Sequence, residues 1–447
     1  MEYKADVLIL GGGISGLALA ERLKDSGYKT LVLEKAAEAG GLSRTARAGE
    51  FLFDLGGHRL YFSKPEVRKW TEKLLAGRGL LRRRRSSAVF TGGRLLNYPP
   101  TPLNGLLYAA PLLFSARRAA PKPHGQPTLK DWLENRLGPG VHDLYFRDYT
   151  KKVWGLGTDE LSPLWAERRI GGGFSLKSLL LELLGGRLSS KENAGSFLYP
   201  EKGIGELPAA LAESAGPSMT LLTNAEPLEL AFKNGLPAGL AFKMGGERHT
   251  AGFRFLVSSI PLTSLLGLFP GETGRKAVGL KYRSLVVLFA ALRRRQRLAQ
   301  HWVYFPDQDA AFSRACELAN WSPLMAPGGW LPMTFEFFCD EGDAVWNLKD
   351  EELAARAFAS PALKALAGAC ETGRVAAARL PHAYPLLYSG SEAPLAAAKA
   401  ALAGFTNLAL CGRTGSHAYQ DTEECLLDAW AAAERVKRSL HENPVRP

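Results

Sequence analysis

Three glycines near the N-terminus have a spacing that suits close contact between the backbone and a phosphate group. Gly11, Gly13 and Gly16 follow a short apolar run and precede a helical pattern. In the pattern G-x-G-x-x-G the first glycine permits a tight turn, the second lets the backbone approach a pyrophosphate, and the third packs the helix closely on the strand. Ser15 lies in the same turn, where the helix N-terminus offers N–H donors to phosphate oxygens.

A carboxylate completes this arrangement further along the chain. Glu34 ends a second apolar run eighteen residues after Gly16, a position where an acidic side chain accepts the ribose hydroxyls of a dinucleotide. The glycines and Glu34 together predict a dinucleotide site, and an ordinary glycine turn with a surface acid at a strand end is the alternative. No second G-x-G-x-x-G follows a strand, so a separate nicotinamide site is not expected.

A second glycine pair follows Glu34 and extends the predicted contact surface. Lys35 comes first, and Gly41, Leu42 and Ser43 follow after a short loop. Because glycine lacks a Cβ, a second pair allows another close approach to a cofactor that is too long for one turn. We therefore include these four residues among the candidate cofactor contacts. A flexible loop is the alternative interpretation.

The elements that must position these residues follow from hydrophobic periodicity. Residues 6–10 and 29–34 are typical of buried strands, and residues 15–26 are typical of the helix between them, which gives a βαβ unit. Further strand-like runs and a final helical pattern continue this domain at residues 219–223, 228–232, 253–258, 408–410 and 423–439. Other segments, separated from these, show strand patterns at 282–291, 302–305 and 333–338 and helical patterns at 129–137 and 351–367.

These patterns predict an α/β protein with two domains. The first is a doubly wound, dinucleotide-binding domain formed by residues 1–75, 195–275 and 395–447. The second is an inserted α+β substrate domain formed by residues 76–194 and 276–394, and its first part is expected to be mostly helical.

Composition and charge restrict the class of protein. The chain has 447 residues, a net charge of +12, five cysteines without a C-x-x-C pair and eight histidines without ligand spacing. We therefore expect no disulfide framework and no metal centre. The arginine runs 82–85 and 293–297 are expected to form solvated basic faces; they lack the interleaved aromatic residues of a single-strand binder, so no nucleic acid is predicted.

Partners and location follow from the same data. The positive charge favours a small, anionic substrate, and the cysteine usage favours a reducing cytoplasmic location. The apolar stretches are too short to span a bilayer, which leaves only peripheral membrane contact open. The oligomeric state is not predicted.

Several longer motifs resemble one known family. They are Phe53-Asp54-Leu55-Gly56-Gly57-His58, Tyr149-Thr150-Lys151-Lys152-Val153-Trp154-Gly155 and Gly412-Arg413. With the glycine pair after Glu34, they resemble the FAD-dependent amine oxidase and protoporphyrinogen oxidase superfamily, in the branch close to UDP-galactopyranose mutase. The resemblance covers almost the entire chain and implies FAD as the cofactor, bound to a Rossmann-like domain of the GR2 type.

The resemblance also implies which residues meet the flavin. A loop like Gly56-Gly57-His58 lies against the flavin ring in this family, and Gly412-Arg413 reaches its edge. An arginine there would stabilise the negative charge of reduced flavin, and His58 could donate a hydrogen bond or move a proton. His58 and Arg413 are thus the candidate catalytic residues, with a purely structural histidine as the alternative.

Two further groups of contacts follow from the family pattern. Asp421 and Thr422 precede the last helix, whose start contacts FAD in the family, and Thr422 is expected to be the N-cap. For substrate binding, Tyr149 and Trp154 match residues that line the sugar-nucleotide site of the mutases, although core packing is an alternative for such aromatics. Arg169 and Arg283 could pair with a diphosphate.

The chain also departs from the family pattern. Glycines occupy positions 171–173, where the mutases carry a second arginine, and His417 and Gln420 stand where they carry tyrosines. Pro227 replaces a valine whose backbone N–H meets the adenine, and proline has no N–H.

The predicted function is an FAD-dependent oxidoreductase that moves a hydride from substrate to flavin N5. A UDP-galactopyranose mutase-like isomerase that uses reduced FAD is the alternative, and a flavin-binding scaffold without turnover is the third hypothesis.

Overall fold

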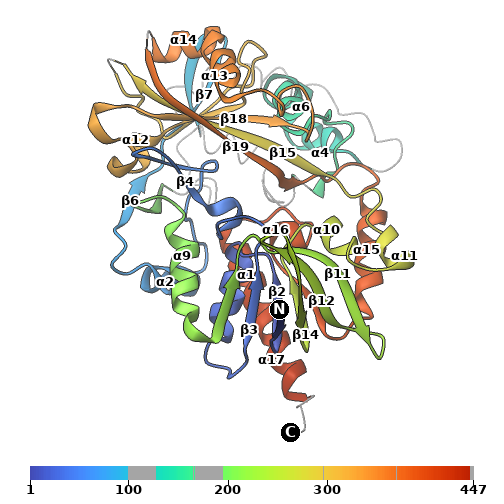
Figure 1. Ribbon diagram of the computed structural model, residues 1–447. Coiled ribbons are helices and arrows are strands. Elements are labelled where there is room, and N and C mark those ends of the chain that lie inside the picture. The colour runs from blue at the N-terminus through green and yellow to red at the C-terminus, as the bar shows by residue number, and fades with distance from the viewer. Residues whose placement is uncertain (99–126, 165, 167–194, 295, 369, 443–447) are drawn as a thin grey trace.

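A five-stranded parallel sheet in the lower half of Figure 1 joins three distant parts of the chain. The computed structural model describes residues 1–98, 127–164, 166, 195–294, 296–368 and 370–442. The strand order is β10 (Met219–Leu222), β3 (Thr30–Leu33), β2 (Val7–Leu10), β14 (Phe255–Ser258) and β20 (Leu408–Leu410), and every neighbouring pair is parallel. Every residue of β2, β3 and β14 is buried, as expected for a parallel sheet that is covered on both faces.

Helices cover one face of this sheet. They are α1 (Ile14–Leu23), α9 (Glu206–Ala215) and α17 (Thr422–Glu442), and Val7 and Ile9 of β2 share their apolar core. Leu8 and Leu10 belong to a different core on the opposite face, because successive side chains of a strand point in opposite directions.

The opposite face is covered mainly by a second sheet. Its order is β1 (Glu2–Lys4), β13 (Glu247–Gly252), β12 (Leu236–Met244) and β11 (Glu226–Lys233), and it is joined there by α10 (Leu262–Leu266) and α15 (Glu392–Ala403). The expected α/β architecture is present, but the domain is not doubly wound as predicted, because a second sheet that includes the strand predicted over 228–232 replaces most of the helices on this face. The short helix α11 (Gly271–Arg275) lies beside α10 and α15.

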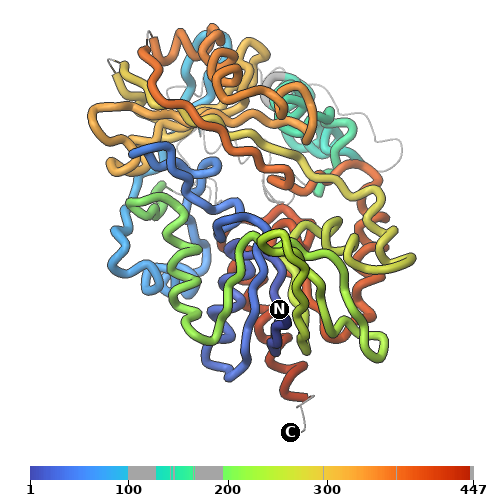
Figure 2. The backbone as a smooth tube through the Cα atoms, viewed as in Figure 1, coloured from blue at the N-terminus to red at the C-terminus, as the bar shows by residue number. Residues whose placement is uncertain are grey.

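A seven-stranded sheet lies in the upper half of the molecule in Figure 1, and Figure 2 follows the backbone of both halves from the same side. Its order is β19 (Glu371–Pro385), β15 (Tyr282–Arg293), β18 (Met333–Cys339), β17 (Arg314–Glu317), β16 (Trp302–Tyr304), β7 (Ser87–Thr91) and β8 (Arg94–Tyr98). On β15, Val286 and Leu288 share a core with helices α13 (Asp350–Ala359) and α14 (Pro361–Ala367). Val287 and Phe289 face the other way, where Phe53 stacks on Phe289 at 4.9 Å.

Phe53 belongs to a hairpin that connects the two halves. The hairpin is formed by β4 (Thr45–Ala48) and β5 (Phe51–Asp54). Its last residue, Asp54, accepts hydrogen bonds from Thr45 Oγ1 at 2.6 Å, Tyr199 Oη at 2.5 Å and Ile204 N at 3.1 Å. The loop that contains His58 therefore starts from a firmly anchored residue.

The described part of the section 76–193 is less helical than the sequence suggested. It contains β7, β8 and β6 (Leu80–Arg84), which pairs with β9 (Ser196–Pro200). Gly92 and Gly93 both have positive φ and form the two-residue turn between β7 and β8, the backbone that such hairpins require. The arginine run concealed this strand pattern.

The arginine runs are also less exposed than expected. Arg294 is fully buried in an ion pair with Glu317, and Arg83 Nε donates to the carbonyl oxygen of Trp321 at 2.9 Å. The prediction that both runs form solvated basic faces is therefore wrong for Arg83 and Arg294.

The helix expected over 351–367 is interrupted. Proline at position 361 begins α14, and Ser360 Oγ accepts from Leu363 N at 3.4 Å as its cap. Two short helices result, because a proline lacks the N–H that a continuous helix would use.

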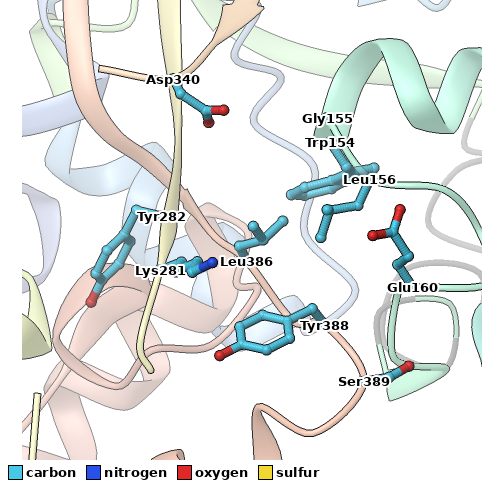
Figure 3. Close-up of a pocket in the computed structure, with 10 residues that line it drawn as sticks. All are labelled: Trp154, Gly155, Leu156, Glu160, Lys281, Tyr282, Asp340, Leu386, Tyr388 and Ser389. Carbon is cyan, nitrogen blue, oxygen red and sulfur yellow. The ribbon is translucent and has the colours of Figure 1, made fainter. Parts of the chain in front are cut away.

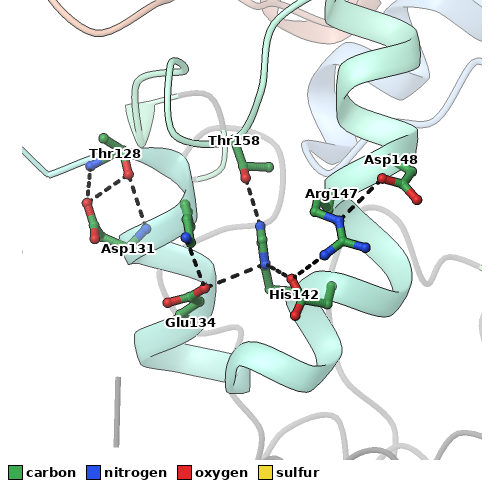
Figure 4. Close-up of polar contacts among 9 residues, drawn as sticks. Thr128, Asp131, Glu134, His142, Arg147, Asp148 and Thr158 are labelled. Atoms are coloured by element: carbon green, nitrogen blue, oxygen red, sulfur yellow. Dashed lines mark hydrogen bonds and ion pairs between the residues drawn. The ribbon is translucent and has the colours of Figure 1, made fainter. Parts of the chain in front are cut away.

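A polar network fixes the helices that carry Trp154. The helix α4 (Leu129–Leu137) has the predicted bounds, and α5 (Pro139–Val141), a π-helical turn (His142–Phe146) and α6 (Arg147–Trp154) follow. In Figure 4, buried His142 contacts Thr158 Oγ1 at 2.7 Å and Asp143 Oδ1 at 3.0 Å, and it pairs with Glu134 at 3.6 Å. The remaining short elements are α2 (Pro65–Leu74), α12 (Leu318–Trp321), α16 (Gly412–Gly415) and the 3₁₀ turns Gly41–Ser43, Gly216–Ser218, Pro323–Met325 and Pro327–Gly329.

The described residues contain neither a membrane-spanning helix nor a cluster of metal ligands. Within them, no helix is both long and apolar enough to cross a bilayer. The same residues contain no group of three or more His, Cys, Asp or Glu side chains placed to hold a metal ion.

Candidate active site

The two glycine turns lie against each other at the carboxyl end of the parallel sheet. Gly40 N donates to Gly12 O at 2.7 Å, and a Cβ added to Gly41 would stand 3.1 Å from the Cα of Gly13. A Cβ on Gly16 would overlap the carbonyl oxygen of Gly11, whereas a Cβ on Gly13 would have no neighbour closer than 3.8 Å. Gly16 is therefore required by the packing of the protein itself, and Gly13 faces open space.

Glu34 is held in place beside the first turn. Its Oε2 accepts from Gly12 N and its Oε1 from Ala36 N, both at 2.8 Å. Each carboxylate oxygen can still accept a further bond, since it has two lone pairs. Lys35 points elsewhere and forms an exposed ion pair with Glu226 at 2.7 Å.

The second glycine turn is a 3₁₀ turn that includes Leu42 and Ser43. Ser43 is buried, and Leu42 is partly buried against the apolar core under the seven-stranded sheet. Arg44 Nε donates to Gly41 O at 3.0 Å and closes the turn.

The turn around Arg413 is tied to the last helix. Asp428 Oδ2 accepts from Gly412 N at 2.8 Å, Ser416 Oγ at 3.0 Å and Gln420 Nε2 at 3.1 Å. Gly412 lies directly against Ser15 of α1. The turn predicted near the C-terminus therefore meets the first glycine turn.

The last helix begins one residue earlier than predicted, at Thr422. Asp421 Oδ1 accepts from Glu424 N at 3.0 Å, and Asp421 N donates to Glu424 Oε2 at 2.8 Å. Asp421 is thus the N-cap, with reciprocal bonds of the capping-box kind. The prediction that Thr422 is the cap is wrong, because Thr422 is the first helical residue.

These features fit a bound dinucleotide. The open space beside Gly13 allows the close approach that a pyrophosphate needs, and Glu34 is anchored where ribose hydroxyls can reach it. Pro227 lies in β11, opposite Phe242, and lacks the N–H donor. The nearby N–H of Ala225 is used by Glu34 O at 2.9 Å.

His58 and Arg413 are brought close together. His58 Nδ1 lies 3.0 Å from Gly56 O, so in the neutral ring Nδ1 carries the hydrogen and Nε2 is an acceptor. Burial lowers the pKa of His58 to about 4, and the positive charges of Arg413 and Arg314 add to this effect. His58 is therefore neutral near pH 7.

The sequence analysis missed an aromatic layer beside Arg413. The rings of Tyr384 and Tyr419 stack, with their centroids 5.8 Å apart and an angle of 14° between their planes. The guanidinium carbon of Arg413 lies 4.9 Å from the centroid of the Tyr384 ring. Trp154 meets the same ring edge-on at 5.7 Å. Tyr149 packs against Tyr304 at 6.0 Å. Tyr149 and Trp154 of α6 thus pack in one apolar cluster with aromatic residues from distant parts of the chain.

A buried ion pair supports this layer and was also missed. Arg314 and Glu336 are 2.5 Å apart and almost wholly buried, and Arg314 lies 5.0 Å from the Trp302 ring and 4.7 Å from the Phe338 ring. Burial opposes ionisation of Tyr384, but Arg314 and Arg413 outweigh it and hold its pKa below the ordinary value. The two residues stand alone on separate strands, so no sequence spacing could have connected them.

Of the two arginines predicted to bind a diphosphate, Arg169 and Arg283, the structure describes only Arg283. Arg283 is buried, with Nε donating to Val153 O at 2.9 Å and Nη1 lying 2.6 Å from Asp340 Oδ1. Its guanidinium is occupied by protein acceptors and holds the end of α6. Arg169 lies outside the described residues.

A cavity of about 720 Å³ opens beside Trp154 (Figure 3). Leu156, Leu386 and Tyr388 contribute apolar surface to its walls, and Lys281 contributes a charged group. It borders the aromatic layer, because Trp154 contacts Tyr384.

Comparison with known proteins places the chain in a family. The profile of the family described as flavin containing amine oxidoreductase matches residues 14–437. The chain belongs to this family. It is therefore a flavin amine oxidoreductase family enzyme.

Curated relatives match shorter segments. The chain is 38% identical to pseudooxynicotine dehydrogenase of Pseudomonas sp over 72 residues, 16% of this chain and 14% of that protein. It is 47% identical to flavin-containing amine oxidase B of Sus scrofa over 58 residues, 13% of this chain and 11% of that protein. The matches thus span only a small part of each relative.

Solved structures match nearly the whole chain. A reduced UDP-galactopyranose mutase superposes with a TM-score of 0.80 at 20% identity, over 97% of this chain and 93% of that one. A protein described as a putative protoporphyrinogen oxidase, from Exiguobacterium sp. 255-15, gives 0.72 at 18% identity, over 98% and 99%. At these identities the likeness shows the mixed α/β fold.

Proposed function

We propose that this protein binds FAD across its two glycine turns and is an oxidoreductase that removes a hydride from a small, anionic substrate. When bound, FAD supplies the hydride acceptor, its N5 atom. One observation carries the proposal: the Gly412-Arg413 turn packs on Ser15 of the first glycine turn, and the charge of Arg413 acts on buried His58. Cofactor-holding backbone and candidate reactive side chains therefore share one place.

The protein would hold FAD through backbone donors and one carboxylate. Gly13 and Gly41 leave room for the pyrophosphate, and Glu34 would accept the ribose hydroxyls. Leu42, Ser43 and the capped start of α17 at Asp421 would flank the remainder. Without an N–H at Pro227, adenine would lose one hydrogen bond.

Arg413 and His58 would act on the flavin ring in different ways. Arg413 is held by the bond from its Nε to Gln420 O at 2.8 Å, and its positive charge would stabilise negative charge on the reduced ring. His58 is neutral and offers an acceptor at Nε2, so it would take a hydrogen bond and not supply a proton at neutral pH.

The aromatic layer would orient the substrate and exclude water. Trp154, Tyr384 and Tyr419 present flat apolar surface beside Arg413. Arg314 is neutralised by Glu336, and the positive charge of Arg413 favours a substrate with a negative group over a cationic one.

A mutase-like isomerisation of a sugar nucleotide is the second candidate. It is favoured by the presence of Tyr149 and Trp154 in the aromatic layer. It is disfavoured by Arg283, because the guanidinium that would bind the diphosphate already contacts Val153 O and Asp340.

An anaerobic visible spectrum of the purified protein, titrated with protoporphyrinogen, amines and UDP-galactose, tests the proposal. We expect one compound to bleach the oxidised flavin, while free FAD at the same concentration stays unchanged. A response of the chemically reduced protein to UDP-galactose alone would instead assign the mutase reaction. No response in either state would leave the protein as a flavin-binding scaffold.

A further inference from the structure

The cavity of Figure 3 lies one aromatic layer away from the proposed flavin site. Trp154 lines the cavity and meets the edge of Tyr384, whose ring lies under Arg413. Tyr282 also lines the cavity, and its hydroxyl donates to Thr414 O at 2.9 Å. Trp154 of the aromatic layer lines the cavity, but neither His58 nor Arg413 does, so the proposed reaction does not account for the charged groups in its walls.

Among the residues that the structure describes, the walls carry one positive and one negative group without an ionic partner. Lys281 is exposed, and its Nζ lies 5.5 Å from the centroid of the Tyr388 ring; it forms no ion pair with any residue that the structure describes. Glu160 is also exposed and accepts from Gly157 N at 2.8 Å, and within the same residues it too has no ion pair.

The other carboxylate at the cavity is already neutralised. Asp340 Oδ1 lies 2.6 Å from Nη1 of buried Arg283. A ligand therefore meets one net positive charge, at Lys281, and one net negative charge, at Glu160.

These two charges lie apart. Figure 3 shows Lys281 on one side of the cavity and Glu160 on the other, with Leu386 and Tyr388 between them. A molecule whose opposite charges were adjacent could not satisfy both groups at once. A volume of about 720 Å³ is within the usual range for small-molecule sites.

We infer that this cavity is a binding site for a small molecule with a carboxylate at one end, an ammonium group at the other and an apolar chain between them. The carboxylate contacts Lys281, the ammonium contacts Glu160, and the chain packs on Leu386 and the Tyr388 ring. This site goes beyond the proposed function, because none of the residues assigned to the flavin lines the cavity.

Isothermal titration calorimetry on the purified holoprotein tests the site with three matched probes. They are 6-aminohexanoate, which carries both charges, and hexylamine and hexanoate, which carry one each. Each exposed ion pair is worth a modest amount, so we expect 6-aminohexanoate to bind about fivefold more tightly than either single-charge probe. Equal affinities for the three probes, or no heat with 6-aminohexanoate, would overturn the inference.

Two single variants assign the ends of the ligand. In Lys281→Met, the affinity for 6-aminohexanoate should fall to that for hexylamine, while hexylamine binding stays unchanged. In Glu160→Gln it should fall to that for hexanoate, with hexanoate binding unchanged. Lys4→Met, on an exposed position of β1, is the matched control and should bind all probes as the wild type does.

The variants also separate this inference from the proposed function. If both variants bind 6-aminohexanoate like the wild type, the inference fails, whatever the flavin spectrum does. If no compound bleaches the flavin but the binding pattern holds, the proposed function fails and the site remains.

Discussion

The two halves of this protein build their parts of the site from different materials. At the carboxyl end of the parallel sheet, the contacts come from glycines and backbone N–H groups that are close in sequence, such as Gly12 N on Glu34. Under the seven-stranded sheet they come from side chains of separate helices and strands, such as Arg314 of β17 with Trp302 of β16 and Tyr384 of β19 with Trp154 of α6. The first half depends on local spacing and the second on tertiary pairing.

The largest effect is expected at a glycine that the protein needs for its own packing. In Gly16→Ala the added Cβ would overlap the carbonyl oxygen of Gly11, and backbone cannot move away cheaply. We expect a loss of roughly 3 kcal/mol or more in stability and a fall of roughly 5 °C or more in the midpoint of thermal denaturation followed by circular dichroism. An unchanged midpoint would show that the turn is not packed as described.

Gly13 separates cofactor contact from folding in the same turn. A Cβ there meets nothing within 3.8 Å, so Gly13→Ala should melt like the wild type when both are stripped of flavin. Because the methyl group fills the space meant for the pyrophosphate, FAD affinity measured by fluorescence titration should fall about tenfold or more, roughly 1.4 kcal/mol. Unchanged FAD affinity would mean that the cofactor lies elsewhere.

The half built from side chains contains a histidine that should make the stability of the protein sensitive to acid. Burial, with help from the charge of Arg59, lowers the pKa of His301 to about 4, below the ordinary value of 6.5. The folded state then binds fewer protons than the unfolded state, so this stability is present above pH 6.5 and is lost as pH falls toward 4.

His301→Phe should reduce that sensitivity. Between pH 7 and pH 5 the wild type should lose about 1–2 kcal/mol more unfolding free energy than the variant, measured by urea denaturation. His441→Gln, at the exposed end of α17, serves as control and should follow the wild type. If the His301 variant shows the same pH dependence as the wild type, the histidine is not held neutral in the folded protein.

The features that depend on local sequence could be predicted, and those that depend on tertiary pairing could not. The βαβ unit, β20 and α17 follow from periodicity, and the first glycine turn follows from a fixed spacing. Tyr384 was not found, because it belongs to the fifteen-residue strand β19 and meets its partners only through sheet pairing. Tyr419 was not predicted either, because it lies between two positions, 417 and 420, that lack the tyrosines of the family. It meets Tyr384 of β19 only in the folded protein.

Other errors have local causes. The arginines of β6 alternate in exposure along a strand, but as a run they suggested a surface face. The cap at Asp421 was displaced by one residue because Asp421 and Thr422 are both good caps, and only the bond to Glu424 distinguishes them. The domain boundaries and the cofactor contacts stay predictions.

Arg413 is where the two halves meet, and its effect on the flavin is the central claim. The most direct test is a spectroelectrochemical titration of the wild type, Arg413→Lys and Arg413→Met. Because the guanidinium charge would stabilise the reduced ring, the methionine variant should have a two-electron midpoint potential lower by about 30 mV or more, and the lysine variant should lie between. The same potential in the wild type and the methionine variant would contradict the account.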